Sequence, residues 1–245
     1  MKRILILLLL LLVNPLSAQS FEIPEDSRQL VVVSNKNWDD PVGRMYRFER
    51  ESSTSPWKQV GKAVPINLGR TGLAWGSSPL MKTPQSGKVK KEGDGRSPAG
   101  VFPILKAFGH PKPPTGYDAE NLDFLVVTDE QCVDDRNSEY YNQVVDPDKV
   151  GGVTWDSAET MKIDLYRLGL VVGHNCPKAS PGMGSCIFFH LQRGPGQPTA
   201  GCTSMTDAAL TELVLWLHTK EKPVVVQLPE RIYQAQGDGF PKWGK

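Results

Sequence analysis

The chain has 245 residues, and its 28 Lys and Arg against 27 Asp and Glu give a formal net charge of +1 at pH 7. This balance gives no electrostatic case for binding nucleic acid or an anionic membrane. The 23 glycines and 20 prolines are many for a helical protein, so strands, turns and long loops are favoured. The length suits one domain.

Residues 1–18 have the pattern of a secretory signal peptide. Lys2 and Arg3 precede an unbroken apolar run over residues 4–13, and Ser17 and Ala18 are small residues at which a signal peptidase would cut. The apolar run is shorter than the roughly 20 residues that span a bilayer, which favours cleavage over a membrane anchor. We therefore expect an exported protein of the periplasm or cell envelope, with no stable membrane span after cleavage.

The segments that follow predict a β-rich α+β domain with mixed sheets or a sandwich and a few helices. We expect a short linker over residues 19–29 and one domain over residues 30–245, of which about the last 15 residues form a polar tail. The first strands form an antiparallel meander. They are predicted at residues 30–34, 44–50, 57–60 and 63–68.

Residues 92–102 hold three glycines and a proline, which force turns. The segment is either an ordinary hairpin crossing or a loop that lines a cleft. Residues 111–147 are rich in loop signals, with one strand predicted at 124–127.

The second half of the chain alternates predicted helices and strands. A helix is expected over residues 156–168, and two short apolar runs predict buried strands at 170–172 and 187–189. Residues 206–220 give the clearest helical pattern, with apolar side chains at i, i+3, i+4 and i+7 and with Ser204 or Thr206 as the cap. A last strand is predicted at 224–228.

The chain has four cysteines: Cys132, Cys176, Cys186 and Cys202. In an oxidising compartment they could form two disulfides, in any of three pairings. Alternatively one thiol is free for chemistry, which leaves at most one disulfide and a spare cysteine. The sequence alone does not choose between these interpretations.

His190 ends the predicted strand 187–189, and Cys202 follows twelve positions later (202 − 190 = 12). The turn-rich loop 194–198 between them can bring thiol and imidazole side by side. A neighbouring histidine activates a cysteine, first as general base and later as general acid. Gly201 permits a tight backbone that would aim the N–H groups of Gly201 and Cys202 at a developing oxyanion.

Other interpretations of the same residues remain open on spacing alone. The histidine could be structural and the cysteine bridged. A zinc site is conceivable but lacks paired C-x-x-C ligands, so no metal is predicted. Its ligands would be Cys176, Cys186, His190 and Cys202.

Phe189-His190 followed by Thr199-Ala200-Gly201-Cys202 resembles the signature of the YkuD-like L,D-transpeptidases, which are cysteine enzymes that modify peptidoglycan. That signature is a histidine, a variable loop and a Ser/Thr-x-Gly-Cys motif. The resemblance extends over residues 30–228, because further segments fall in the expected order. These segments are residues 69–76, 92–102, 140–142 and 173–175.

Two positions depart from the family pattern. Many members have histidine directly before the Gly-Cys pair, where this chain has Ala200. Many also have arginine or asparagine two places after the cysteine, where this chain has Ser204. We therefore carry no contact with substrate over from the family to these two positions.

The resemblance implies that Cys202 attacks a stem tetrapeptide of peptidoglycan at the carbonyl of its penultimate diamino acid. D-Alanine leaves, and an amine from a neighbouring stem or a wall-attached protein resolves the thioester. No cofactor is implied. His174, Ser185 and Thr199 are candidates for the substrate cleft, although His174 could equally pack beneath the site.

Two alternatives lead to different chemistry. With water as the acceptor, the enzyme would be an L,D-carboxypeptidase or a hydrolase of wall peptides or wall–protein links. With all four cysteines bridged, the protein would bind or support the wall without catalysis. A count of free thiols distinguishes this last alternative from the other two.

Overall fold

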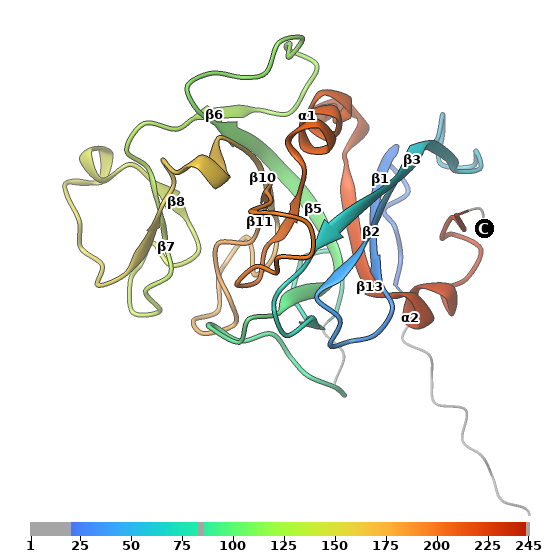
Figure 1. The fold of residues 1–245 in the computed structure, drawn as a ribbon, viewed down its shortest axis with the longest axis horizontal. Helices are drawn as coiled ribbons and strands as arrows, with labels where there is room; N and C mark the ends of the chain where they lie inside the picture. The colour runs from blue at the N-terminus through green and yellow to red at the C-terminus, as the bar shows by residue number, and fades with distance from the viewer. Residues whose placement is uncertain (1–20, 83–85, 244–245) are drawn as a thin grey trace, which may run out of the picture.

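The computed structural model describes residues 21–82 and 86–243. The predicted signal peptide, residues 1–18, lies outside this part of the chain. The described residues are rich in β-strand and contain two α-helices, which confirms the predicted fold class (Figure 1).

The domain begins with the predicted antiparallel meander. β1 (Gln29–Asn35) pairs with β2 (Val42–Glu49), and β2 pairs with β3 (Lys58–Asn67). The two strands predicted at 57–60 and 63–68 are a single strand, β3. Its register against β2 shifts beside Gly61, which has a φ of 67°, a left-handed conformation that glycine adopts without steric cost.

The sheet closes on itself through the long strand β5 (Ser97–Gly109). β5 pairs with β13 (Val224–Pro229) through its first half and with β10 (Leu168–Val172) through its second half. β13 is therefore internal, because it also lies parallel to β1. From β10 the sheet continues through β11 (Phe188–Leu191) and β12 (Thr203–Met205) to β3, which completes the ring.

Two short strands extend this sheet beside β5. β4 (Leu73–Trp75) pairs in parallel with the beginning of β5, and β6 (Phe124–Val126) pairs in parallel with its end. The strand predicted at 124–127 is thus confirmed. The interior of the ring is filled by aliphatic and aromatic side chains, and β1 is buried along its whole length.

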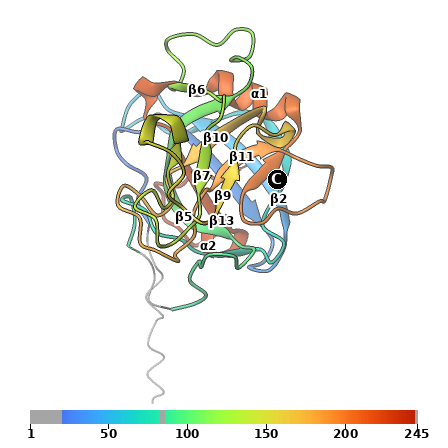
Figure 2. The same ribbon diagram turned by 90° about the vertical axis from the view of Figure 1, so that its left-hand side faces the viewer.

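A separate three-stranded sheet lies in front of β10 and β11, as Figure 2 shows. Its strands run in the order β8-β7-β9, and neither β7 nor β8 was predicted. The three strands are β7 (Gln131–Val133), β8 (Val144–Val145) and β9 (Ala158–Thr160). A 3₁₀ helix, η1 (Pro147–Val150), connects β8 to β9.

The helix predicted over residues 156–168 is wrong. This segment contains β9 and a short 3₁₀ helix, η2 (Asp164–Tyr166). The Asp156 N–H donates to Asp135 Oδ2 at 3.0 Å, and β9 pairs with β7. Pairing with a distant segment thus prevails over the local apolar spacing that suggested a helix.

The predicted helix after the Gly-Cys pair is α1 (Asp207–Trp216). The Thr206 hydroxyl accepts the Ala209 N–H and caps it, as predicted. The helix ends earlier than expected, and η3 (Thr219–Glu221) follows it. Among the described residues, no helix is both long enough and apolar enough to cross a membrane.

Both ends of the described chain pack against the domain. The expected tail forms α2 (Glu230–Gln234), with the side chains of Tyr233 and Phe240 buried. At the other end, Phe21 is buried and its ring lies 5.6 Å from that of Trp75, so the described part of the expected linker is also packed. These buried aromatic side chains hold both segments against the domain.

Candidate active site

The strands β11 and β12 position the predicted pair. They run parallel, with His190 opposite Ser204, and Cys202 directly precedes β12. His190 and Cys202 therefore line one cavity of about 340 Å³. The remaining described residues around this cavity are Glu159, Thr160, Ile163, Leu165, Tyr166, Arg193, Gln197, Pro198, Thr199, Ala200 and Ser204.

Cys202 is a buried thiol, 8% exposed. Its Sγ accepts the Phe188 N–H at 3.3 Å and faces the Cys186 carbonyl oxygen at 3.4 Å. Burial, together with the carboxylate charge of Glu159, raises the pKa of the Cys202 thiol to about 12. The side chain is therefore a thiol at neutral pH, and to act as a nucleophile it would need a base.

His190 can supply that base. Its Nδ1 lies 2.8 Å from the Leu191 carbonyl oxygen. Because a carbonyl only accepts, Nδ1 carries the proton and Nε2 keeps its lone pair. Burial lowers the pKa of His190, so the imidazole is neutral at pH 7. The ring of Tyr166 packs edge-on at 5.4 Å and holds the imidazole in place.

Hydrogen bonds fix the backbone at Cys202. The Cys202 carbonyl accepts from Ser97 Oγ at 2.9 Å and from Thr199 Oγ1 at 2.6 Å. The Gly201 N–H donates to Thr199 Oγ1 at 3.1 Å. Because this N–H is already engaged, the Cys202 N–H is the better candidate for the predicted oxyanion role. A Cβ at Gly201 would lie 3.0 Å from the Arg96 carbonyl oxygen, which favours glycine here.

Two glycine-containing segments, residues 69–76 and 92–102, hold the backbone around Cys202 through hydrogen bonds. Ser97 Oγ accepts the Gly69 N–H at 2.8 Å, and the Arg70 N–H donates to the Thr199 carbonyl at 2.9 Å. Ser97 of the segment 92–102 thus supports the backbone of Cys202 directly. None of residues 92–102 lines the cavity at Cys202, so the loop supports the site without forming its wall.

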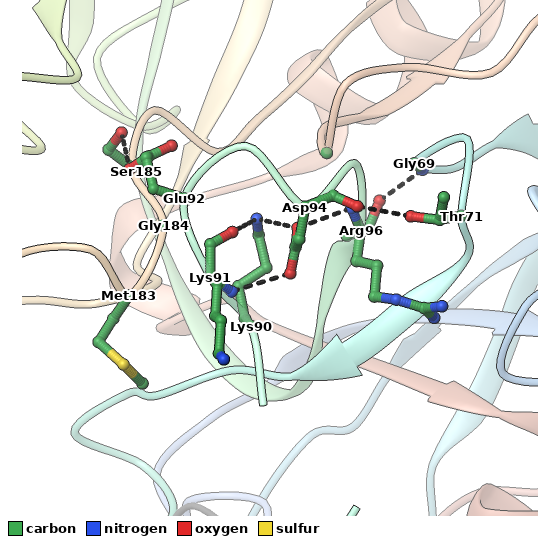
Figure 3. A network of polar contacts seen from close by, with 12 residues as sticks. Gly69, Thr71, Lys90, Lys91, Glu92, Asp94, Arg96, Met183, Gly184 and Ser185 are labelled. Atoms are coloured by element: carbon green, nitrogen blue, oxygen red, sulfur yellow. Dashed lines mark hydrogen bonds and ion pairs between the residues drawn. The ribbon is translucent and has the colours of Figure 1, made fainter. Parts of the chain in front are cut away.

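Asp94 organises the same loop, as Figure 3 shows. One of its oxygens, Oδ1, accepts from Lys90 Nζ at 2.7 Å and from the Arg96 N–H at 2.9 Å, and Oδ2 accepts the Lys91 N–H at 2.8 Å. The Lys90 side chain is only 3% exposed, so this ion pair is buried on the lysine side. The ion pair between Lys90 and Asp94 therefore stabilises the loop in addition to its turns.

Of the three predicted cleft residues, only Thr199 lines the cavity. His174 is 1% exposed, and its Nε2 donates to the Met183 carbonyl at 2.9 Å while Nδ1 accepts the Ser77 N–H at 3.4 Å. The Ser185 hydroxyl donates to Glu92 Oε2 at 2.7 Å. His174 and Ser185 thus lie outside the cavity at Cys202. Their polar atoms form hydrogen bonds that hold neighbouring loops.

Sequence reasoning missed the charged and aromatic residues of the cavity. Tyr166 donates its hydroxyl to Glu159 Oε2 at 2.6 Å, and Arg193 follows the end of β11 by two positions. Glu159 and Tyr166 fell within the helix that was wrongly expected over residues 156–168. Of these three residues, only Arg193 had a signal in the sequence, because it lies three positions after His190.

Cys132 and Cys186 form a disulfide, whereas Cys176 and Cys202 are free. This contradicts the alternative in which all four cysteines are bridged and agrees with one disulfide, one spare and one free thiol at the site. The zinc alternative is also wrong, because Cys186 is not available as a thiolate. Within residues 21–82 and 86–243, no group of three or more His, Cys, Asp and Glu side chains could hold a metal ion.

The fold and the site define a β-rich domain with a buried cysteine and a neutral histidine at one cavity. The family model of the YkuD L,D-transpeptidase catalytic domain matches residues 38–226, which is most of the chain. The chain therefore belongs to this family, whose members act on the peptidoglycan peptides of the cell wall. Curated proteins and solved structures gave no significant match.

Proposed function

We propose that this protein is an exported peptidoglycan L,D-transpeptidase with Cys202 as the nucleophile and His190 as the general base and acid. One observation carries the proposal. In a domain of the L,D-transpeptidase family, a free thiol and a neutral imidazole line the same cavity.

In the first step, Sγ of Cys202 attacks the carbonyl carbon between the penultimate diamino acid of a stem tetrapeptide and its terminal D-alanine. Nε2 of His190 takes the thiol proton as the C–S bond forms. When the C–N bond breaks, the imidazolium returns that proton to the departing amine of D-alanine. A thioester to the shortened peptide remains.

In the second step, an amine attacks the thioester carbonyl and His190 accepts its proton. The C–S bond breaks, the thiol is regenerated, and a new amide joins donor and acceptor. The amine comes from a neighbouring stem peptide or from a wall-attached protein. Hydrolysis of the same thioester would release the tripeptide acid and make the enzyme a carboxypeptidase.

Export is part of the proposal. The signal-peptide pattern of residues 1–18 directs the domain to the periplasm or cell envelope. The Cys132–Cys186 disulfide supports this location, because disulfides persist in oxidising compartments.

Purified protein should be incubated with a tetrapeptide muropeptide, with and without a second muropeptide as the amine acceptor, and the products resolved by mass. We expect D-alanine release together with a cross-linked product that requires the acceptor. Tripeptide as the sole product, at every acceptor concentration, would identify a carboxypeptidase instead.

Two cysteine variants control this experiment. Cys202→Ala should form neither product, whereas Cys176→Ala removes the other free thiol and should keep the activity of the original protein. A cross-link made by folded Cys202→Ala would contradict the assignment of the nucleophile.

A further inference from the structure

The Cys202 thiol donates its proton to the Cys186 carbonyl oxygen, with 3.4 Å between sulfur and oxygen. Sγ in turn accepts the Phe188 N–H at 3.3 Å. Within the described chain, no hydrogen bond joins this sulfur to His190. A thiol has a single proton to donate. In the resting protein that proton is therefore directed at the Cys186 carbonyl, and the thiol must turn before His190 can accept it.

The direction of this carbonyl depends on an unusual backbone conformation. Cys186 has a φ of 55°, in the left-handed region, where the Cβ of a residue other than glycine crowds the carbonyl oxygen. Such a conformation persists only where the surrounding structure holds it. Here it directs the Cys186 N–H to Asn142 and the Cys186 carbonyl to Cys202. The backbone of this one residue thus links the Asn142 side chain to the thiol.

The Asn142 carboxamide holds the Cys186 backbone. Its Oδ1 accepts the Cys186 N–H at 2.9 Å. Its Nδ2 donates to the carbonyl oxygens of His174 and Asn175, each at 3.0 Å. These partners use both amide hydrogens and define the orientation of the carboxamide, because an N–H only donates and a carbonyl only accepts. The side chain therefore ties the segment before β11 to the segment after β10.

A second connection lies beside the first. Glu92 Oε2 accepts the hydroxyls of Tyr141 at 2.5 Å and of Ser185 at 2.7 Å. These two residues directly precede Asn142 and Cys186, and Figure 3 shows Ser185 beside Glu92. Without the Asn142 carboxamide, the two segments would still be joined through Glu92. Its loss should therefore change the conformation at Cys186 more than the fold.

We propose that Asn142 is a positioning residue for Cys202 that acts through the Cys186 backbone. By holding the Cys186 carbonyl beside Sγ, it keeps the proton on the thiol until the thiol turns toward His190. A thiol reacts with oxidants and disulfides far more slowly than a thiolate, so this contact protects Cys202 in an oxidising compartment. The inference rests on the proposed function, in which Cys202 is the nucleophile.

The hydrogen bond of the thiol can be measured by the infrared S–H stretching band. With Cys176→Ala as the background, Cys202 has the one S–H group of the chain, because Cys132 and Cys186 are bridged. We expect the band at a lower frequency than that of a simple thiol in an apolar solvent, since a hydrogen bond weakens the S–H bond. A band at the frequency of the free thiol would overturn the proposal before Asn142 is changed.

Asn142→Gly in the same background tests the positioning residue itself. Asn142 has a φ of 63°, which glycine adopts without strain, so this variant removes the carboxamide and keeps the backbone. The S–H band should move to higher frequency. Alkylation of Cys202 by iodoacetamide at pH 8 should become roughly fivefold faster, as expected for one lost hydrogen bond to the thiol.

Asn175→Gly is the matched control. Asn175 has a φ of 53°, and its carboxamide also makes three hydrogen bonds, but these go to Ser180 and Gly184 and not to Cys186. The band and the alkylation rate should both stay as in the background protein. An unchanged band in folded Asn142→Gly, or equal shifts in the two glycine variants, would overturn the proposal.

Asn142→Asp keeps an oxygen that can accept the Cys186 N–H and serves if Asn142→Gly does not fold. Its S–H band should remain at the frequency of the background protein, and a band at the frequency of the free thiol would contradict the link through Cys186. These measurements require no transfer activity. A hydrogen-bonded thiol in a protein that forms no thioester with a tetrapeptide would instead overturn the proposed function, and the positioning role with it.

Discussion

At the scale of single residues, the proposed nucleophile and base can be named from the sequence, but their ionisation cannot. The twelve-residue spacing and the Gly-Cys motif predict the pair Cys202 and His190, and the structure places both residues at one cavity. Their protonation states depend on burial within the folded domain, which raises the pKa of Cys202 and lowers that of His190, and on the negative charge of Glu159 from another segment, which adds to the rise at Cys202. No local pattern reveals that the resting pair is neutral instead of a thiolate with an imidazolium.

The neutral pair predicts the pH dependence of acylation. His190 must be unprotonated to accept the thiol proton, and its pKa is lowered below 6.5. We expect kcat/KM to be level above pH 6.5 and to fall as the pH drops through that lowered pKa, by about tenfold per unit. The thiol, with a pKa near 12, causes no loss on the alkaline side up to pH 9.

Alkylation by iodoacetamide, with Cys202 and Cys176 separated by peptide mapping, supplies an independent check. The rate at Cys202 should still be rising between pH 7 and 9, because little thiolate is present. A rate that is already maximal at pH 6 would indicate a preformed thiolate and contradict the neutral pair.

Protonation of His174 should destabilise the fold in acid. Burial lowers its pKa to about 4. Between pH 6.5 and 4 the unfolded chain therefore binds a proton that the folded protein does not, so stability is greatest above pH 6.5 and falls with pH. Over this range the loss is on the order of 3 kcal/mol. An NMR titration of the His174 ring with a midpoint near 6.5 would refute this.

At the scale of elements, apolar patterns predict those strands and helices that bury one face against the ring. β1, β10 and β11 overlap the strands predicted from apolar runs, and α1 begins at its predicted cap. The three-stranded sheet does not, since its strands have only two or three residues and are defined by pairing with one another. Such short strands carry too few residues for a periodic signal.

The loop that supports Cys202 depends on one buried ion pair. Asp94→Asn would leave the Lys90 ammonium buried beside a neutral amide, and we expect a loss of roughly 3 kcal/mol in the free energy of unfolding, measured with urea. Asp39→Asn removes a carboxylate that pairs with Lys88 and Arg96 at the exposed surface, so its effect should be clearly smaller. Equal effects of the two variants would argue against a supporting role for Asp94.

At the scale of the whole molecule, the site lies where the closed sheet meets the three-stranded sheet. The closed sheet supplies Cys202 and His190, and the smaller sheet and the segment after it supply Glu159 and Tyr166. A second apolar cluster joins the two parts. Sequence reasoning predicted the first half of this site because its residues share one motif, and missed the second half because only tertiary pairing assembles it.

The Cys132–Cys186 disulfide connects the two parts across 54 positions. Loop-closure entropy gives it a stabilising effect of about 4 kcal/mol. The double variant Cys132→Ala, Cys186→Ala should lose stability of this order. It should also acylate more slowly, because Glu159 lies opposite Cys132 and the Cys186 carbonyl contacts Sγ of Cys202.

Reduction of the Cys132–Cys186 disulfide in the original protein should likewise lower its stability and slow its acylation. Mild reductant that spares the disulfide, verified by thiol counting, is the control. Unchanged acylation in the fully reduced protein would show that the smaller sheet keeps its place without the covalent link.

The most direct test of the central claim is the intact mass of the protein after brief exposure to a tetrapeptide donor without an acceptor. We predict an increase equal to the donor minus D-alanine, labile to hydroxylamine and located by peptide mapping on Cys202. The adduct should be absent from Cys202→Ala. An adduct of the same mass on Cys176, or one that persists in Cys202→Ala, would contradict the account.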